Sequence, residues 1–343
     1  MKKKQKKYHR KILYLGNNLK NSNSNLSGIQ ILGPLLESEG YELYYASSKA
    51  NKVLRLIDMM RSCLIYSKTV DLVLIDTYST QNFYYAWLIS KICRLFSLPY
   101  IPILHGGNLP KRLQSHPKKS ESLFNNALYN ISPSLYLKEA FENKGYTNIV
   151  HIPNAIKIEN YRFSKKKFDE PRLLWVRSFS KIYNPQLAIK VLKSLRSLYP
   201  NAQLCMVGPD SDGTLQEVKE VAFKLNVNVK FTGKLTKQEW IHISKDYNIF
   251  INTTNFDNTP VSVIEAMALG LPIVSTNVGG MPFLIDNNKN GVLVEPNSED
   301  QMVKAIIDIL NDDIKRDQII KNARLKVEGF DWQNVKELWI DVL

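Results

Sequence analysis

Short apolar runs alternate with segments of helical spacing along the whole chain. Twelve such runs fall into two sets of six, and the segments between them, such as 185–199 and 298–310, place apolar residues at helical intervals. This alternation is typical of parallel sheets covered by helices. The sequence therefore predicts an α/β protein with two doubly wound, Rossmann-like domains. The runs are 11–16, 41–47, 71–76, 100–106, 128–132 and 149–153, then 171–178, 202–208, 229–233, 247–252, 272–276 and 291–295.

A polar segment separates the two sets. Residues 157–170, KIENYRFSKKKFDE, show no apolar periodicity, and a chain of 343 residues suits two domains. We predict an N-terminal domain over 1–156, a linker over 157–170 and a C-terminal domain over 171–330. Residues 331–343 form a C-terminal helix that is a candidate to pack back towards the N-terminal domain. Such sheets bind ligands at the carboxyl ends of their strands, so the cleft between the domains is the expected place for chemistry.

One predicted helix carries a carboxylate that its surroundings do not explain. The stretch DNTPVSVIEAMALGLP has apolar residues almost all the way round a helix that starts at Pro260, with only Ser262 and Glu265 polar. A helix of this kind belongs in a core, where an unpartnered carboxylate costs several kcal/mol. The helix start, with Asp257 just before it, offers free N–H groups to an anion. A turn residue at Asp257 and a structural hydrogen bond at Glu265 are the simpler interpretations.

Other charged or titratable side chains follow predicted strand ends. Arg177 and Lys181 come after the run that opens the second set, and cations of this kind are able to bind an anion, although the loop by itself is bland. His105 lies at the end of the run 100–106, directly before Gly106 and Gly107. A lone histidine is more often structural, but its place at a strand end beside two glycines favours a functional role.

Charge separates the two halves of the chain. Residues 1–150 hold 21 Lys and Arg against 9 Asp and Glu, whereas the rest holds 25 against 23. A solvated lysine tail explains part of this excess, and an anionic surface facing the first domain is the alternative. Basic residues at 49, 52, 55, 61 and 68 flank apolar residues at 53, 54, 57, 59, 60 and 64, which fits a basic amphipathic helix or a helix packed on the core. No nucleic-acid reader motif accompanies the charge.

Composition points to a cytoplasmic protein. The three cysteines, Cys63, Cys93 and Cys205, match no zinc or redox spacing, which favours a reducing compartment. The apolar stretch after the basic N-terminus is too short for a signal peptide, and residues 83–104 are interrupted by Lys91 and Arg94. We expect a cytoplasmic location, with peripheral attachment to the inner face of the membrane as a candidate.

The second half of the chain resembles a known enzyme family. Asp257 with Glu265 eight positions later, followed by AMALGLPIVSTNVGG, is similar to the E/D-x7-E signature of family 4 glycosyltransferases. The resemblance implies the GT-B fold, with two Rossmann-like domains facing across a cleft, and retaining transfer from a nucleotide sugar. It is specific over the second domain and rests on architecture and scattered motifs over the first. Asp at the first acidic position, in place of the commoner Glu, is a tolerated variant.

The resemblance also implies roles for single residues. Glu265 would bind the donor ribose, and Asp257 would contact hydroxyls of the transferred sugar. Arg177 and Lys181 would grip the diphosphate, although their spacing is shorter than the family's usual one, and His105 would face the reaction centre. The remaining donor contacts implied are Gly28, Gly208, Lys234 and Leu235, with backbone groups near Asn258, Thr259, Pro260 and Val261.

These expectations combine into one function. The chain is expected to transfer a hexosyl group from a UDP- or GDP-sugar to a hydroxyl of a glycan or lipid-linked acceptor, as in polysaccharide biosynthesis, with retention and without metal or cofactor. The partners expected are the nucleotide sugar, the acceptor and an anionic membrane surface at the basic first domain, with no nucleic acid.

Three alternatives stay open at this stage. One is a nucleotide-sugar epimerase or phosphorylase on the same fold, which would alter a sugar without transferring it. Another is a non-catalytic subunit that binds a nucleotide sugar or a partner. The third is a nicotinamide dehydrogenase, which is disfavoured because no G-x-G-x-x-G follows the first strand.

Overall fold

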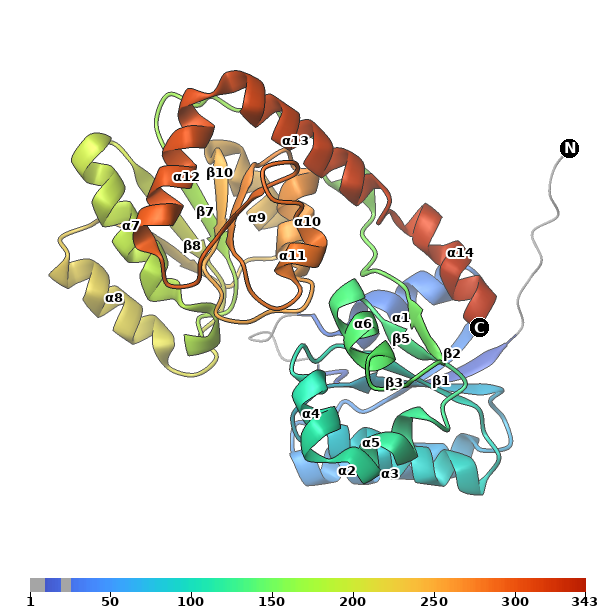
Figure 1. Cartoon of the computed structure of the whole chain (residues 1–343). Helices are drawn as coiled ribbons and strands as arrows, with labels where there is room; N and C mark the ends of the chain where they lie inside the picture. Colours follow the sequence, from blue (N-terminus) through green and yellow to red (C-terminus); the bar gives the residue numbers. More distant parts are fainter. Residues whose placement is uncertain (1–9, 20–25) are drawn as a thin grey trace, which may run out of the picture. The chain divides into compact units, whose positions relative to one another are not determined.

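The computed structural model describes residues 10–19 and 26–343. Most of the predicted lysine-rich tail and the centre of the Asn/Ser-rich segment after the first strand lie outside these residues. The chain divides into two compact units, one formed by residues 1–155 and 332–343 and the other by residues 156–331. Figure 1 shows both units, each with helices around a sheet.

The first unit is built on a six-stranded parallel sheet with the order β2-β1-β3-β4-β5-β6. Alternate side chains of each strand enter two different cores, because successive residues of a strand point to opposite faces. Leu13 and Val73 pack into one cluster, whereas Ile12 and Leu74 pack into the other. The strands are β1 (Lys11–Leu15), β2 (Glu42–Ala46), β3 (Leu72–Thr77), β4 (Tyr100–Leu104), β5 (Asn130–Ser132) and β6 (Ile149–His151).

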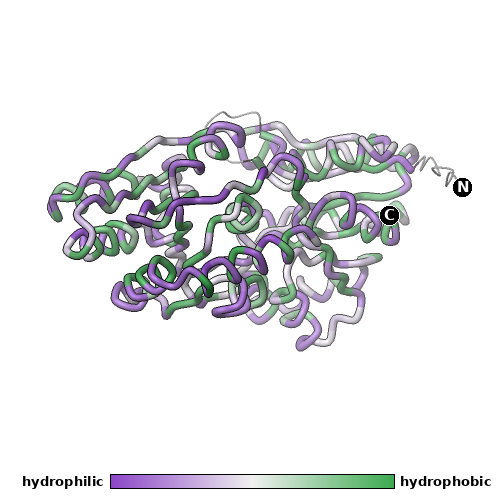
Figure 2. Tube along the Cα trace, turned by 90° about the horizontal axis from the view of Figure 1, so that it is seen from above, coloured by the Kyte–Doolittle hydropathy of each residue, from purple (hydrophilic) through white to green (hydrophobic). Residues whose placement is uncertain are grey.

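Helices cover both faces of this sheet, as a doubly wound fold requires. They are α1 (Gly28–Ser38), α2 (Lys52–Tyr66), α3 (Asn82–Leu95), α4 (Leu109–Ser115), α5 (Pro117–Phe124) and α6 (Leu135–Glu142). Green and purple alternate along the helical tubes in Figure 2, and each helix has buried apolar residues, such as Ile29 and Leu36 on α1 and Phe83 and Ile89 on α3. Buried apolar faces of this kind hold the helices on the sheet.

The last helix of the chain, α14 (Trp332–Val342), belongs to the first unit. Trp332, Val335 and Trp339 are buried in the same cluster as Ile12 and Tyr14. The indole Nε1 of Trp332 donates to Glu39 Oε1 at 2.9 Å, just beyond the end of α1. This red helix therefore lies against the blue segments of the chain in Figure 1, although 293 residues separate the bonded pair.

The second unit repeats the architecture with the strand order β12-β11-β10-β7-β8-β9. Its elements are β7 (Arg172–Val176), α7 (Pro185–Leu198), β8 (Gln203–Val207), α8 (Thr214–Lys224), β9 (Lys230–Gly233), α9 (Lys237–Ile243), β10 (Ile249–Asn252), α10 (Val261–Ala268), β11 (Ile273–Thr276), α11 (Met281–Leu284), β12 (Val292–Val294), α12 (Glu299–Asn311) and α13 (Asp313–Glu328). Both predicted sets of six strands are therefore confirmed as parallel sheets.

The segment predicted as a linker groups with the second unit. Residues 157–170 belong to the second unit, and Tyr161 is only 4% exposed within them. The carbonyl of Tyr161 accepts a hydrogen bond of 2.8 Å from Arg324 on α13, and its hydroxyl reaches α10. The segment lacks periodicity because single residues, and not one face of a helix or strand, anchor it to the core.

No helix within residues 10–19 and 26–343 is long and apolar enough to cross a membrane. Helix α2 nevertheless exposes several large apolar side chains. Val53, Leu54, Ile57, Leu64 and Ile65 are all exposed on it, whereas Met59 and Cys63 are buried.

Candidate active site

The acidic loop, residues 253–260 of the second unit, joins β10 to α10. The helix begins at Val261 with Pro260 as its N-cap, one residue later than the sequence predicted, because Pro260 has an extended backbone. The N–H groups of Val261 and Ser262 have no acceptor among the described residues, and the Ser262 hydroxyl is buried without a partner. Unpaired donors at a helix start form a site for an anion or a hydroxyl-rich ligand.

Two glycines after β11 hold this loop in place. The Gly280 N–H donates to the Asp257 carbonyl at 3.0 Å. A Cβ at Gly279 would lie 2.2 Å from that same carbonyl oxygen, and one at Gly280 would lie 1.9 Å from the carbonyl oxygen of Asn258. No other residue allows the two backbones to approach this closely. The sequence interpretation quoted this pair without assigning it a role.

Arg177 and Asp257 form a partly buried ion pair. Their side chains are 15% and 13% exposed, and the second Asp257 oxygen, Oδ1, accepts from the Asn258 N–H at 2.9 Å. The Arg177 guanidinium also stacks on Tyr183, with Cζ 4.2 Å from the ring centroid. Burial lowers the pKa of Arg177, but a guanidinium stays charged at neutral pH. Its Nε is buried with no partner among the described residues, so one donor is left for a ligand.

Glu265 has partners within the protein. Its side chain is 3% exposed, and Oε1 accepts from the Tyr161 hydroxyl at 2.6 Å and from the Lys237 ammonium at the start of α9. The structural hydrogen bond that the sequence left open as the simpler interpretation is therefore present, and a ribose contact by Glu265 stays a prediction. Burial and the charge of Glu265 raise the pKa of Tyr161, which therefore remains a donor. Oε2 has no partner among the described residues.

Lys181 lies apart from this pairing. Its side chain is 72% exposed and its ammonium is 3.2 Å from Glu217 Oε1 on α8. The backbone carbonyl of Lys181 accepts from the Asn255 side chain at 3.3 Å, so the loop around it supports the acidic loop while the ammonium points to another partner. The described structure brings Lys237, and not Lys181, to a site carboxylate. A diphosphate contact by Lys181 stays a prediction.

The remaining predicted donor contacts gather at the same strand ends. A Cβ at Gly208 would lie 1.8 Å from the Arg177 carbonyl oxygen, so this glycine allows β7 and β8 to end side by side. Lys234 is exposed just after β9, and Leu235 is half-buried against the core. Asn258 and Pro260 are buried and Thr259 is half-buried in the acidic loop, ahead of Val261 at the start of α10. Ligand contacts by these residues stay predictions.

His105 of the first unit is paired with a buried carboxylate. Its Nε2 lies 2.7 Å from Oδ1 of Asp76, the last residue but one of the fully buried strand β3. Gly28 starts α1 beside them, and a Cβ there would lie 2.6 Å from His105 Cε1 and Nε2. Gly28 therefore makes room for the imidazole, and a donor contact by it stays a prediction. The sequence analysis missed Asp76, although an aspartate closing an apolar strand is a visible signal.

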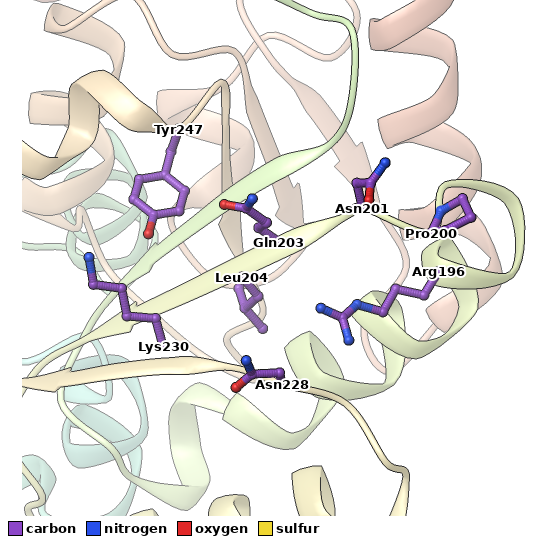
Figure 3. Close-up of a pocket in the computed structure, with 8 residues that line it drawn as sticks. All are labelled: Arg196, Pro200, Asn201, Gln203, Leu204, Asn228, Lys230 and Tyr247. Atoms are coloured by element: carbon purple, nitrogen blue, oxygen red, sulfur yellow. The ribbon is translucent and has the colours of Figure 1, made fainter.

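A hollow of about 350 Å³ lies elsewhere on the second unit (Figure 3). Gln203 at the start of β8 and Lys230 at the start of β9 line it, so it opens at the amino ends of these strands. Arg177, Asp257 and Gly208 follow the carboxyl ends. Because parallel sheets bind ligands at their carboxyl ends, the candidate site is the acidic loop and not this hollow.

Comparison with known proteins identifies relatives for the second unit. Residues 157–326 match the family described as glycosyl transferases group 1. The sulfoquinovosyl transferase SQD2 of Arabidopsis thaliana is 30% identical over 149 residues, which cover 43% of this chain and 28% of that protein. An Escherichia coli UDP-Gal:alpha-D-GlcNAc-diphosphoundecaprenol alpha-1,3-galactosyltransferase is 24% identical over 236 residues, covering 63% and 59%. The chain thus spans from 28% to 59% of these curated relatives.

A solved structure matches nearly the whole chain. Anabaena HepE, crystallised in complex with UDP-glucose, superposes with a TM-score of 0.79 at 18% identity, covering 97% of this chain and 99% of that one. At this identity the likeness establishes the fold. The GT-B fold predicted from the sequence is therefore confirmed.

Proposed function

Because residues 157–326 match the glycosyl transferases of group 1, we propose that the chain is a glycosyltransferase that moves a hexosyl group from a UDP- or GDP-sugar to an acceptor hydroxyl with retention of configuration. The observation that carries this proposal is the Arg177–Asp257 pair beside the unpaired N–H groups of α10. A cation, a carboxylate and free backbone donors together suit a sugar attached to a diphosphate.

The donor is recognised by the second unit in this proposal. Glu265 Oε2 accepts hydrogen bonds from the ribose hydroxyls, and Asp257 accepts from hydroxyls of the transferred sugar. Gly208, Lys234 and Leu235 form the rim that faces the base. The support is that Glu265 and Asp257 stand on the two sides of the helix start, one within α10 and one in the loop before it.

Chemistry then rests on charge compensation and positioning. As the bond between the anomeric carbon and the diphosphate oxygen breaks, negative charge grows on the leaving group. We assign the stabilisation of that charge to Arg177, whose buried Nε has no partner among the described residues, and not to a metal ion. The acceptor hydroxyl attacks the anomeric carbon from the face that the diphosphate leaves and gives its proton to the departing phosphate oxygen, which retains the configuration.

The donor is tested by calorimetry with a panel of UDP- and GDP-sugars, followed by a transfer assay on soluble and lipid-linked acceptors. We expect micromolar to millimolar affinity for one nucleotide class, in the usual range for enzyme substrates. The anomeric configuration of the product is read by NMR. Absence of binding by every nucleotide sugar, or an inverted product, would contradict the proposal.

An anionic membrane surface is the partner proposed for the first unit. Leu54, Ile57 and Leu64 are exposed on α2 together with Arg61 on the same helix and Lys68 just beyond its end. This combination is typical of helices that lie on anionic lipid. Arg55 takes no part, because its guanidinium is buried and donates to the carbonyls of residues 49 and 50. A lipid-linked acceptor would be reached from such a position, and the E. coli relative is named for a diphosphoundecaprenol substrate.

Replacing Ile57 with glutamate is expected to weaken binding to anionic vesicles about tenfold or more. The substitution removes roughly 1.5–3 kcal/mol of apolar burial in the lipid and adds a repelled charge. Pelleting with phosphatidylglycerol vesicles at low and high salt measures the effect. Phe223→Glu is the matched control, because Phe223 is an exposed apolar residue on α8 in the other unit. Equal binding by both variants, or no binding by the wild type at low salt, would exclude this surface.

A further inference from the structure

Asp76 is a fully buried carboxylate around which part of the first unit is arranged. Its side chain has no exposed surface. The Tyr14 hydroxyl donates to Oδ1 at 3.0 Å, and the Ile29 N–H in the first turn of α1 donates to Oδ2 at 3.2 Å. The third contact is His105 Nε2, at 2.7 Å from Oδ1. Burial of a carboxylate costs several kcal/mol unless donors of this kind compensate for it.

The hydrogen-bond pattern fixes where the imidazole carries its proton. Burial, followed by the charge of Asp76, raises the pKa of Tyr14 well above its ordinary value, so this phenol keeps its proton and donates. An ionised carboxylate is only an acceptor. His105 must therefore donate from Nε2, and a neutral imidazole that donates from Nε2 has a lone pair on Nδ1.

The ring is also held by its neighbours. Tyr78 stacks on His105, with ring centroids 5.2 Å apart and planes at 28°. A Cβ at Gly16 would lie 2.5 Å from Asp76 Oδ2, and one at Gly28 would lie 2.6 Å from the imidazole. Two backbones thus close around the pair, while the His105 side chain stays 17% exposed and its Nδ1 has no partner among the described residues.

We propose that Asp76 is a positioning residue that holds His105 in the tautomer protonated at Nε2, so that Nδ1 accepts a hydrogen bond from a sugar hydroxyl. This inference rests on the proposed function only for the identity of the hydroxyl. The tautomer itself is a property of the free protein.

The test is ¹⁵N NMR of histidine-labelled protein, with the His105 signals among the five histidines assigned through His105→Gln. We expect the wild type to be protonated at Nε2. In Asp76→Asn the amide is able to donate to Nε2, which shifts the ring towards the Nδ1-protonated tautomer. We expect kcat for transfer to fall at least about tenfold, with the KM for the donor within about threefold.

Thr77→Val is the matched control, since it removes a buried hydroxyl from the next residue of the same strand, where its partner is the Ile75 carbonyl. It should keep the Nε2 tautomer and the wild-type kcat.

Slower hydrolysis of the donor alone in Asp76→Asn would assign the hydroxyl to the donor sugar, and unchanged hydrolysis would assign it to the acceptor. Protonation at Nδ1 in the wild type overturns the proposal without any variant, as does an unchanged tautomer in Asp76→Asn. Neither result bears on whether the protein is a transferase.

Discussion

Replacing Arg177 with methionine is expected to lower the turnover number for sugar transfer by roughly 10²–10³-fold, the usual effect of removing a group that stabilises charge in a transition state. Arg177 is the cation that the structure pairs with Asp257, and we expect its Nε, which has no partner among the described residues, to donate to the diphosphate. Methionine keeps an unbranched apolar stem but has no charge to offer. Single-turnover kinetics at saturating donor measure the loss.

The loss of Arg177 also leaves Asp257 without its ion pair, which is costly for a partly buried carboxylate. Arg177→Lys separates the two effects, because it retains a positive charge near Asp257 and loses the planar guanidinium. We expect its melting temperature to match that of the wild type and its turnover to fall about tenfold, since the planar set of guanidinium donors is replaced by a single ammonium.

Lys181→Met is the matched control for Arg177. Its ammonium is mostly exposed and paired with Glu217 in this structure, so we expect a much smaller loss of turnover than in Arg177→Met, and the predicted diphosphate contact of Lys181 would account for any loss beyond about threefold. A large loss in Lys181→Met with wild-type turnover in Arg177→Met would reverse the assignment. The loop around Lys181 would then have to move in the bound enzyme.

The parts of the fold that follow from local periodicity were predictable from the sequence. Twelve apolar runs predicted two parallel sheets, and the mostly apolar helix that contains Glu265 was correctly predicted to lie in a core. Residues 157–170 were not predictable in this way. Tyr161 is buried because it bonds to Glu265, 104 positions away, and no local pattern records such a contact.

In the candidate site, too, residues close in sequence were predictable, whereas partners brought together by the fold were not. Spacing near Arg177 selected Lys181, because sequence analysis sees only neighbours along the chain. The lysine that reaches a site carboxylate is Lys237, brought to Glu265 by the packing of α9 beside α10. Asp76 could have been predicted from the sequence, since a charged residue at the end of the apolar run DLVLID already suggests a buried partner. Only residues that follow a predicted strand were candidates, and Asp76 is the last residue within the run 71–76.

Replacing Glu265 with glutamine is expected to weaken donor binding by roughly 10–100-fold while the protein stays folded. Glutamine has the size of glutamate and keeps an acceptor for the Tyr161 hydroxyl, which lies 2.6 Å from Oε1. It replaces Oε2 with an amide donor, so the ribose hydroxyls lose a charged acceptor worth about 1.5–3 kcal/mol. Calorimetry with UDP or GDP, whichever the wild type binds, gives the affinity.

Glu265→Ala should behave differently, because the structure gives this carboxylate a second task. Truncation leaves a cavity and a buried Tyr161 hydroxyl without its acceptor, which together cost about 2–4 kcal/mol of unfolding free energy. Tyr161→Phe is the control that loses the hydrogen bond but keeps the carboxylate and Lys237. It should lose about 1 kcal/mol and bind the nucleotide within about threefold of the wild type. If Glu265→Gln bound the nucleotide as tightly as the wild type, the carboxylate would serve only to join Tyr161 and Lys237 to α10, and the ribose would need another acceptor.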